Sequence, residues 1–278
     1  MKGYKTKWDL TLLYKSPKDP QIEKDMVSIE KACIAFERKY RNKNFIASPK
    51  DLLLALEDSE KLQKSLLGQK PWWYFALSAH MNSEDAFVSG LLAKYEHRAT
   101  VASNRLTFFG LKIAEIAKER QKEFLSYEPL TPFVYLLEKL FEGAKYNLSE
   151  KEENLITLFS QTSHSLWVSG QEKLLSKQTV AHKGRQISVS EAKELIPDLP
   201  KKERRALHKN LYALYKQVSD FAEAELNAIV TYKKIVDEQK GFKKPYSSTL
   251  LSNENDEKSI EMLASVVTKH FSISHKFY

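Results

Sequence analysis

The spacing of histidines and carboxylates decides whether this sequence can hold a catalytic metal. The chain has seven histidines, which are His80, His97, His164, His182, His208, His270 and His275. No two of them stand four residues apart, so the helical zinc motif His-Glu-x-x-His is absent. Glu84 follows His80 by one helical turn, but a single such pair cannot hold a metal ion. The sequence therefore predicts no metal-binding residue within these 278 positions.

Other catalytic motifs are missing as well. The sequence contains neither the phosphate-binding pattern G-x-x-x-x-G-K nor the hydrolase pattern G-x-S-x-G. The acidic runs "EKEEN" (150–154) and "NENDE" (253–257) stand at expected helix starts, where negative charge stabilises the helix dipole. Cys33 shares the apolar side of its predicted helix with Ile29 and Phe36, which indicates a buried structural thiol and not a nucleophile. We predict no catalytic residue and no cofactor in this chain.

Two neighbouring arginines are the remaining polar candidates. Arg204 and Arg205 stand in the run "KKERR" near the start of a predicted long helix. Guanidinium groups at such a place could bind an anion or a carboxylate. A solvated basic turn is the alternative, and it is the one that the mixed charges around them favour.

Composition limits the partners that we expect. The chain carries 44 Lys and Arg against 36 Asp and Glu, a net charge of +8. The basic residues are mostly interleaved with Glu and lack the aromatic residues of a base-stacking surface, so we expect no nucleic-acid partner. No stretch approaches 18 apolar residues, so we expect no membrane partner. A single cysteine excludes an intramolecular disulfide, and together with the lack of a signal peptide it leads us to expect a cytoplasmic protein.

The pattern of apolar residues predicts an elongated all-α fold with long helices. Only 8 Gly and 9 Pro occur, and helix formers dominate. After an extended arm over 5–16, a 3–4 spacing of apolar residues predicts a helix over 21–42. A second helix is expected over 48–67 and a short aromatic one over 71–84. A 25-residue apolar seam over 92–116 requires a partner helix, for which the helix at 21–42 has the matching period.

The second half has its own signals. Ser149 and Glu152 predict a capping box at the start of a helix over 147–160. A small β-hairpin is predicted near 177–189 from the β-forming residues Thr179, Val180, Ile187 and Val189. It turns at "HKGR", and we expect His182 to be exposed at its tip. Residues 201–240 lack Gly and Pro, so one very long helix is expected. We predict a single helical body over 1–278, with a helical bundle over 1–145 and a hairpin and long-helix part over 146–278.

Several ordered landmarks resemble one family. They are the opening "WDLTLLYKSPKDPQIEKDM" with the helix ending "FERKYRNK", the capped helix "YNLSEKEENLITLFSQTSHSLW" with its conspicuous tryptophan, the segment "GRQISVSEAKELIPDLPKKERRALHKNLY", and the ending "HFSISHKFY". Their order and spacing resemble the N-terminal lobe of the oligoendopeptidase F family, zinc peptidases related to thimet oligopeptidase. The resemblance covers essentially the whole chain, although no single landmark is diagnostic.

The resemblance implies a function that this chain shares only in part. It implies a largely helical, clamp-shaped fold with a deep groove that admits short peptides. The zinc site of the family lies in the C-terminal half, where His-Glu-x-x-His and a further Glu serve as ligands and general base. None of those residues occurs here, so no site position is carried over. We expect an inactive N-terminal lobe that takes short peptides as substrate, with zinc in a missing C-terminal half.

The last helix supports this expectation, because it carries apolar residues to the final position without a cap. Phe271, Ile273, Phe277 and Tyr278 are the candidate contacts to the C-terminal catalytic half, which we expect as a partner. A shortened expressed chain and a truncated or split gene both stay open as origins. The alternatives are a stand-alone helical module that binds peptides or proteins without catalysis, and an electrostatic binder of nucleic acid or membranes.

Overall fold

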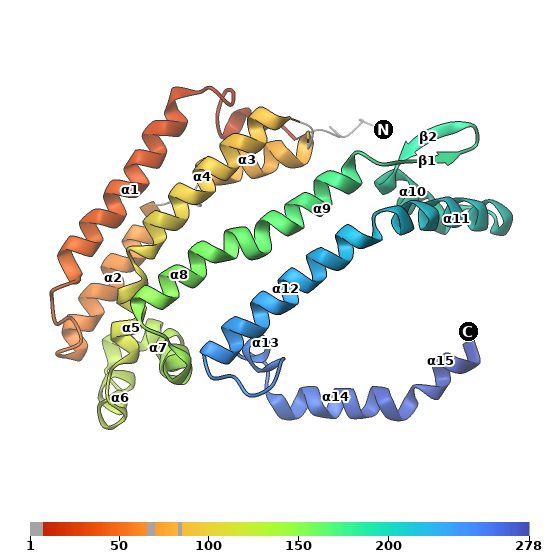
Figure 1. Ribbon diagram of the computed structural model, residues 1–278. Coiled ribbons are helices and arrows are strands. Elements are labelled where there is room, and N and C mark those ends of the chain that lie inside the picture. Colours follow the sequence, from red (N-terminus) through yellow and green to blue (C-terminus); the bar gives the residue numbers. More distant parts are fainter. Residues whose placement is uncertain (1–7, 66–69, 83–84, 278) are drawn as a thin grey trace, which may run out of the picture.

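The computed structural model describes residues 8–65, 70–82 and 85–277, and it confirms an all-α architecture with a small hairpin (Figure 1). The first half consists of α1 (Pro20–Tyr40), α2 (Pro49–Ser65), α3 (Lys70–Met81), α4 (Ala86–Asn104), α5 (Thr107–Ala114), α6 (Lys118–Leu125) and α7 (Val134–Gly143). The second half consists of α8 (Glu150–Ser160), α9 (Leu166–Ser176), β1 (Thr179–His182), β2 (Arg185–Ser188), α10 (Val189–Leu195), α11 (Lys201–Gln217), α12 (Ser219–Gln239), α13 (Ser247–Ser252), α14 (Glu257–His270) and α15 (Ser272–Phe277).

The pairing of α1 with the apolar seam is as the sequence predicted. α1 begins where Asp19 accepts a hydrogen bond from the Gln21 amide at 2.9 Å and Pro20 occupies the first turn. It packs along α4, and the guanidinium of Arg98 on α4 reaches both Glu23 and Glu30 on α1 at 2.7 Å. The seam itself is divided between two helices, because α4 ends at Asn104 and α5 begins at Thr107.

Two apolar cores hold the first half together. One joins α1, α3 and α4, and its buried residues are Tyr14, Ile22, Met26, Tyr74, Phe75, Val88, Tyr95 and Ala99. The other joins α1, α2, α5, α6 and α7, and aromatic rings form its centre, with Phe45 and Phe109 stacked at 4.8 Å. Cys33 is buried as predicted, and burial raises the pKa of its thiol.

Two expectations about chain path are wrong. The described part of the expected extended arm forms a short 3₁₀ turn at Leu10–Leu12, and Tyr14 is then buried, with its hydroxyl donating to Asp25 at 2.7 Å. The expected single helix over 201–240 breaks at Val218, where φ is −105° and ψ is 8°. The apolar period continues across the break, but α11 packs against the hairpin whereas α12 packs against α9, so the two parts need different directions.

The hairpin and its two helices form a third core. β1 and β2 pair antiparallel with Val180 opposite Ile187. Lys183 and Gly184 form the two-residue turn, and both have a positive φ, of 49° and 78°. The inward side chains of the hairpin pack on Leu207, Leu211 and Leu214 of α11. The predicted hairpin at 177–189 is therefore confirmed, and it anchors α11 at the end of α9 (Figure 1).

The C-terminal helices extend away from the packed body. In Figure 1 the green α8 and α9 run from the α5–α7 region to the hairpin, and the blue α12 returns beside them. After α13 the chain turns, and α14 and α15 run along the lower edge of the view to the C-terminal end. None of the helices in the described ranges is long and apolar enough to cross a membrane.

Candidate functional site

The C-terminal helices carry an exposed apolar stripe. Asp256 caps the start of α14, and its side chain accepts a hydrogen bond from the Ser259 amide at 2.8 Å. Every described residue from position 261 to position 273 is exposed. The stripe consists of Met262, Leu263, Val266, Val267, Phe271 and Ile273, with exposed fractions from 48% at Val266 to 64% at Ile273. Soluble surfaces seldom leave so many neighbouring apolar side chains uncovered unless a partner contacts them.

Polar contacts hold the base of α14 to the preceding loop. Lys244 pairs with Glu257 and, at 2.8 Å, with Glu261, and the Tyr246 hydroxyl donates to Glu261 at 3.3 Å. The hydrogen bonds to Glu257 and Glu261 raise the pKa of Lys244, and the bond from Lys244 lowers the pKa of Glu261. These contacts fix the first turn of α14 and leave its apolar stripe free.

A second surface feature lies where α8, α9 and α12 meet. Between α8 and α9 the chain forms a π-helical turn, Gln161–Ser165, a type of local widening that is frequent at functional sites. Behind this turn the Tyr232 hydroxyl of α12 donates to the Ile156 carbonyl at 3.0 Å. A pocket of about 500 Å³ opens between the turn and α12, and its lining consists of Thr162, Ser163, Trp167, Asn227, Ala228, Thr231, Tyr232 and Ile235.

This pocket presents both aromatic surface and hydrogen-bonding groups. Trp167 and Tyr232 supply aromatic surface, and Asn227 and Thr231 supply an amide and a hydroxyl. Trp167 also contacts Phe221, with ring centroids 5.8 Å apart, and this contact holds the indole in position. The arrangement can bind a polypeptide side chain or backbone, and it contains no group arranged for acid–base chemistry.

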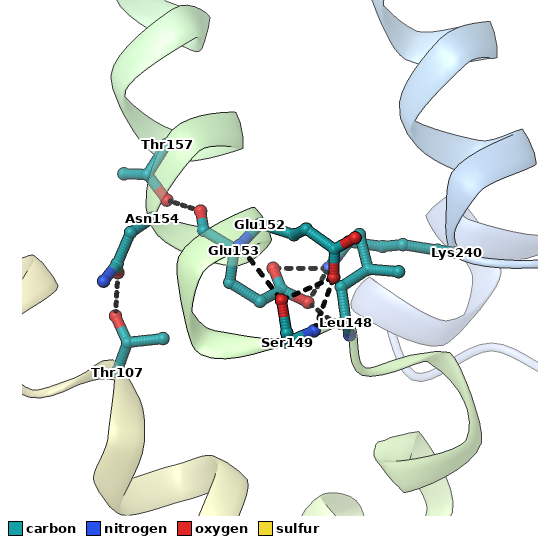
Figure 2. A network of polar contacts seen from close by, with 8 residues as sticks. All are labelled: Thr107, Leu148, Ser149, Glu152, Glu153, Asn154, Thr157 and Lys240. Carbon is teal, nitrogen blue, oxygen red and sulfur yellow. Dashed lines mark hydrogen bonds and ion pairs between the residues drawn. The ribbon is translucent and has the colours of Figure 1, made fainter.

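An ion pair fixes α12 against α8 below the pocket. Figure 2 shows Lys240, which directly follows α12, reaching the Glu153 carboxylate of α8, at 2.7 and 2.8 Å from its two oxygens. Glu153 also accepts a hydrogen bond from the Leu148 amide at 3.1 Å. On the other side of α8, the Thr107 hydroxyl of α5 donates to Asn154 at 2.7 Å.

The capping box predicted at the start of α8 is confirmed in the same place. The Ser149 amide donates to Glu152 at 2.9 Å, and the Glu152 amide donates to the Ser149 hydroxyl oxygen at 3.4 Å (Figure 2). Hydrogen bonds from Ser149 lower the pKa of Glu152. The start of α8 is therefore fixed by its own cap and by contacts to α5 and α12.

The predicted site residues lie far apart in the sequence and on different helices. Arg204 and Arg205 are exposed on α11, and within the described residues neither pairs with a carboxylate. Phe271 and Ile273 are exposed on the C-terminal helices, with fractions of 57% and 64%. Phe277 lies in α15, and Tyr278 falls outside the described residues.

The described histidines do not form a metal site. Among the described residues, no three side chains of His, Cys, Asp or Glu come together as a metal ion would require. His80 is exposed on α3, and its expected neighbour Glu84 lies outside the described residues. His182 ends β1 and is half-buried, in contrast to the exposed tip that we expected, because the turn is formed by the next two residues. Within the ranges that the structure describes, therefore, no set of side chains is arranged to hold a zinc ion.

Sequence reasoning did not find the pocket beside the π-helical turn. Its lining residues are separated by about sixty positions and come together only because α12 returns beside α9. One local signal was present. The polar run "QTSHS" interrupts an otherwise regular amphipathic helical pattern with residues of modest helix propensity, which is a common setting for a local distortion.

Three comparisons bear on the relationship of the chain to known proteins. The Peptidase_M3_N family model, described as Oligopeptidase F, matches residues 112–177. Two curated relatives from Lactococcus lactis are each 20% identical over 284 residues: an oligoendopeptidase F homolog from strain IL1403 and a plasmid-encoded oligoendopeptidase F from subspecies cremoris. Each alignment covers 98% of this chain but only 46% of the relative.

The fold agrees with these matches. The crystal structure of oligoendopeptidase-F from Enterococcus faecium superimposes with a TM-score of 0.76 at 15% identity. The superposition covers 92% of this chain and 51% of that protein, so the chain spans about half the length of the relatives it matches. Family model, curated relatives and fold thus agree in a similarity to the oligoendopeptidase F family, and the part of that family which this chain resembles is the N-terminal portion.

Proposed function

We propose that this chain is the N-terminal, substrate-channel lobe of a zinc-dependent oligoendopeptidase that hydrolyses short peptides. The observation that carries the proposal is the apolar stripe of α14 and α15, which is exposed along its whole described length. Such a stripe suits a large apolar interface, and the chain spans only half the length of its relatives. The partner would be the C-terminal catalytic half, with zinc and the reacting groups in that half.

The contribution of this lobe would be to select and position peptides. The pocket beside the π-helical turn presents aromatic surface and hydrogen-bonding side chains, which suit a peptide segment. Holding a substrate in a fixed orientation accelerates a reaction even when the holding groups do not react. In this proposal residues 1–145 form the supporting bundle and residues 146–278 form the part that meets peptide and catalytic half. A cytoplasmic location accords with the single buried thiol of Cys33.

The test is to assay the purified chain for zinc and for peptide hydrolysis, and to read the coding frame beyond Tyr278. We expect no stoichiometric zinc after dialysis, no cleavage of short peptides, and a continuing frame that encodes His-Glu-x-x-His. Stoichiometric zinc in the chain by elemental analysis would contradict the proposal. A stop codon with no complementary half encoded nearby would contradict it as well.

A stand-alone binding module is the second candidate function, and the same pocket favours it. Its lining can bind a peptide without any metal, because it consists of aromatic, aliphatic and hydrogen-bonding side chains. Isothermal titration of the chain with short peptides separates the two. Binding by the chain alone that matches the affinity of a complete relative would favour the module, and binding that requires the catalytic half would favour the lobe.

A further inference from the structure

Most of the net positive charge of the protein comes from one helix. The 17 residues of α11 hold six Lys and Arg and a single carboxylate, Glu203, so α11 carries +5 of the net charge of +8. The other 261 residues hold 38 Lys and Arg against 35 Asp and Glu, which leaves +3. Glu203 is itself paired with Lys183 of the hairpin turn at 2.9 Å, so it does not neutralise the cations of α11.

Four of these cations share the outer side of α11. Lys202, Arg205, Lys209 and Lys216 are spaced by three, four and seven residues, which places them on one helical face. All four are exposed. The opposite face is fixed by the third core, because Leu207, Leu211 and Leu214 are buried against the hairpin. From Lys202 to Lys216 the row is about 21 Å long, at 1.5 Å per residue.

Among the described residues the cations of this row have no ion-pair partner, unlike several arginines elsewhere in the protein. Arg41, Arg98 and Arg105 each bind a carboxylate at 2.9 Å or less. Within the described residues no carboxylate lies within ion-pair distance of the four cations of the row. A row of uncompensated like charges repels itself, and an external anion would relieve that repulsion.

We propose that this outer face of α11 is a docking surface for an acidic polypeptide segment. Carboxylates at helical or extended spacing can follow a 21 Å row of Lys and Arg and pair with several members at once. A membrane surface fits less well. Tyr212 is the only large hydrophobic residue exposed on α11, so this helix has no apolar face that could insert into a lipid bilayer. Nucleobases also fit less well, since one tyrosine is not a stacking platform. The proposal is independent of peptide hydrolysis.

Fluorescence anisotropy of a labelled oligoglutamate peptide with the full chain tests the surface. The variant K202E/R205E/K209E reverses three charges of the row. Its matched control is K24E/K31E/R38E, which reverses two Lys and one Arg that are exposed on α1 and have no ion-pair partner among the described residues. Both variants change the net charge equally, so any difference between them reports position.

We expect wild-type binding at low salt that weakens as salt rises, a loss of about tenfold in the α11 variant, and little change in the control. Equal loss in both variants would overturn the proposal, because net charge alone would then explain binding. Absence of wild-type binding at low salt would also overturn it. So would tighter binding of duplex DNA or phosphatidylserine vesicles than of oligoglutamate. Circular dichroism checks folding, and K202Q/R205Q/K209Q replaces the reversal variant if that variant is unfolded.

Discussion

The Lys240 ammonium lies 2.7 and 2.8 Å from the two carboxylate oxygens of Glu153, which precedes it by 87 positions (Figure 2). Both side chains are largely withdrawn from solvent, with 23% and 17% exposed. The pair joins the start of α8 to the end of α12, so it helps to place α12, which lines the pocket beside the π-helical turn.

Removing one partner of this pair should destabilise the fold. In Lys240→Met the Glu153 carboxylate loses its charge partner in a poorly solvated place, and we expect a loss of about 1–3 kcal/mol in the free energy of unfolding. Lys234→Met is the control, because Lys234 pairs with Glu238 in an exposed position and should cost at most about 0.5 kcal/mol. Urea denaturation measures both. A double variant with Glu153→Gln should recover part of the loss, and no recovery would argue against the pair as the cause.

Asp58 gives a pH-dependent contribution to stability. The hydrogen bonds from Lys39 and Tyr40 lower the pKa of Asp58 from 3.8 to about 2. Because the folded pKa is below the unfolded one, the contribution is complete above about pH 5 and is lost as pH falls towards 2.

In Asp58→Asn we therefore expect the free energy of unfolding at pH 7 to fall by about 1 kcal/mol, after allowance for solvent screening. The difference from wild type should shrink between pH 5 and pH 3. Urea titrations at several pH values measure this. Glu60→Gln serves as control, since Glu60 makes only an exposed pair with Lys64. A difference that stays constant with pH would contradict the assignment.

Charges placed on the apolar stripe should suppress association of the isolated chain. Val266 and Phe271 are exposed, so Val266→Glu with Phe271→Glu removes apolar contact without disturbing a core. We expect a shift towards monomer in sedimentation velocity and reduced binding of an apolar dye. Ser265→Glu with Thr268→Glu is the control, because it adds the same charge to the polar side of α14. Equal effects of both variants would show that charge, and not the stripe, governs association.

The hairpin turn depends on a left-handed glycine. Gly184 has a φ of +78° although nothing lies within 4 Å of a Cβ built there, so Gly184→Ala should cost about 1 kcal/mol through backbone strain alone. Gly90→Ala is the matched control. Gly90 also has open space around it but lies inside α4, where Ala should stabilise by up to about 1 kcal/mol. Thermal unfolding of both variants checks the opposite signs. A neutral Gly184→Ala would show that the hairpin turn tolerates side chains.

Local signals in the sequence determined much of this fold. The 3–4 apolar spacing predicted α1 and its pairing with α4, the Ser149–Glu152 spacing predicted the cap of α8, and the alternation around Gly184 predicted the hairpin. Each of these depends on residues close together in the chain, where propensity, capping and turn conformation act without tertiary help. The ordered landmarks likewise predicted the oligoendopeptidase F family.

Tertiary structure decided what depends on distant partners. The break at Val218 carries no Gly or Pro and leaves the apolar period intact, so only the different packing of α11 and α12 sets it. The pocket at Trp167 and the pair of Glu153 with Lys240 exist because α12 returns beside α8 and α9. The row of cations on α11 likewise faces outward because the hairpin covers the other side. Packing between segments far apart in sequence is a collective property, and no local pattern of residues encodes it.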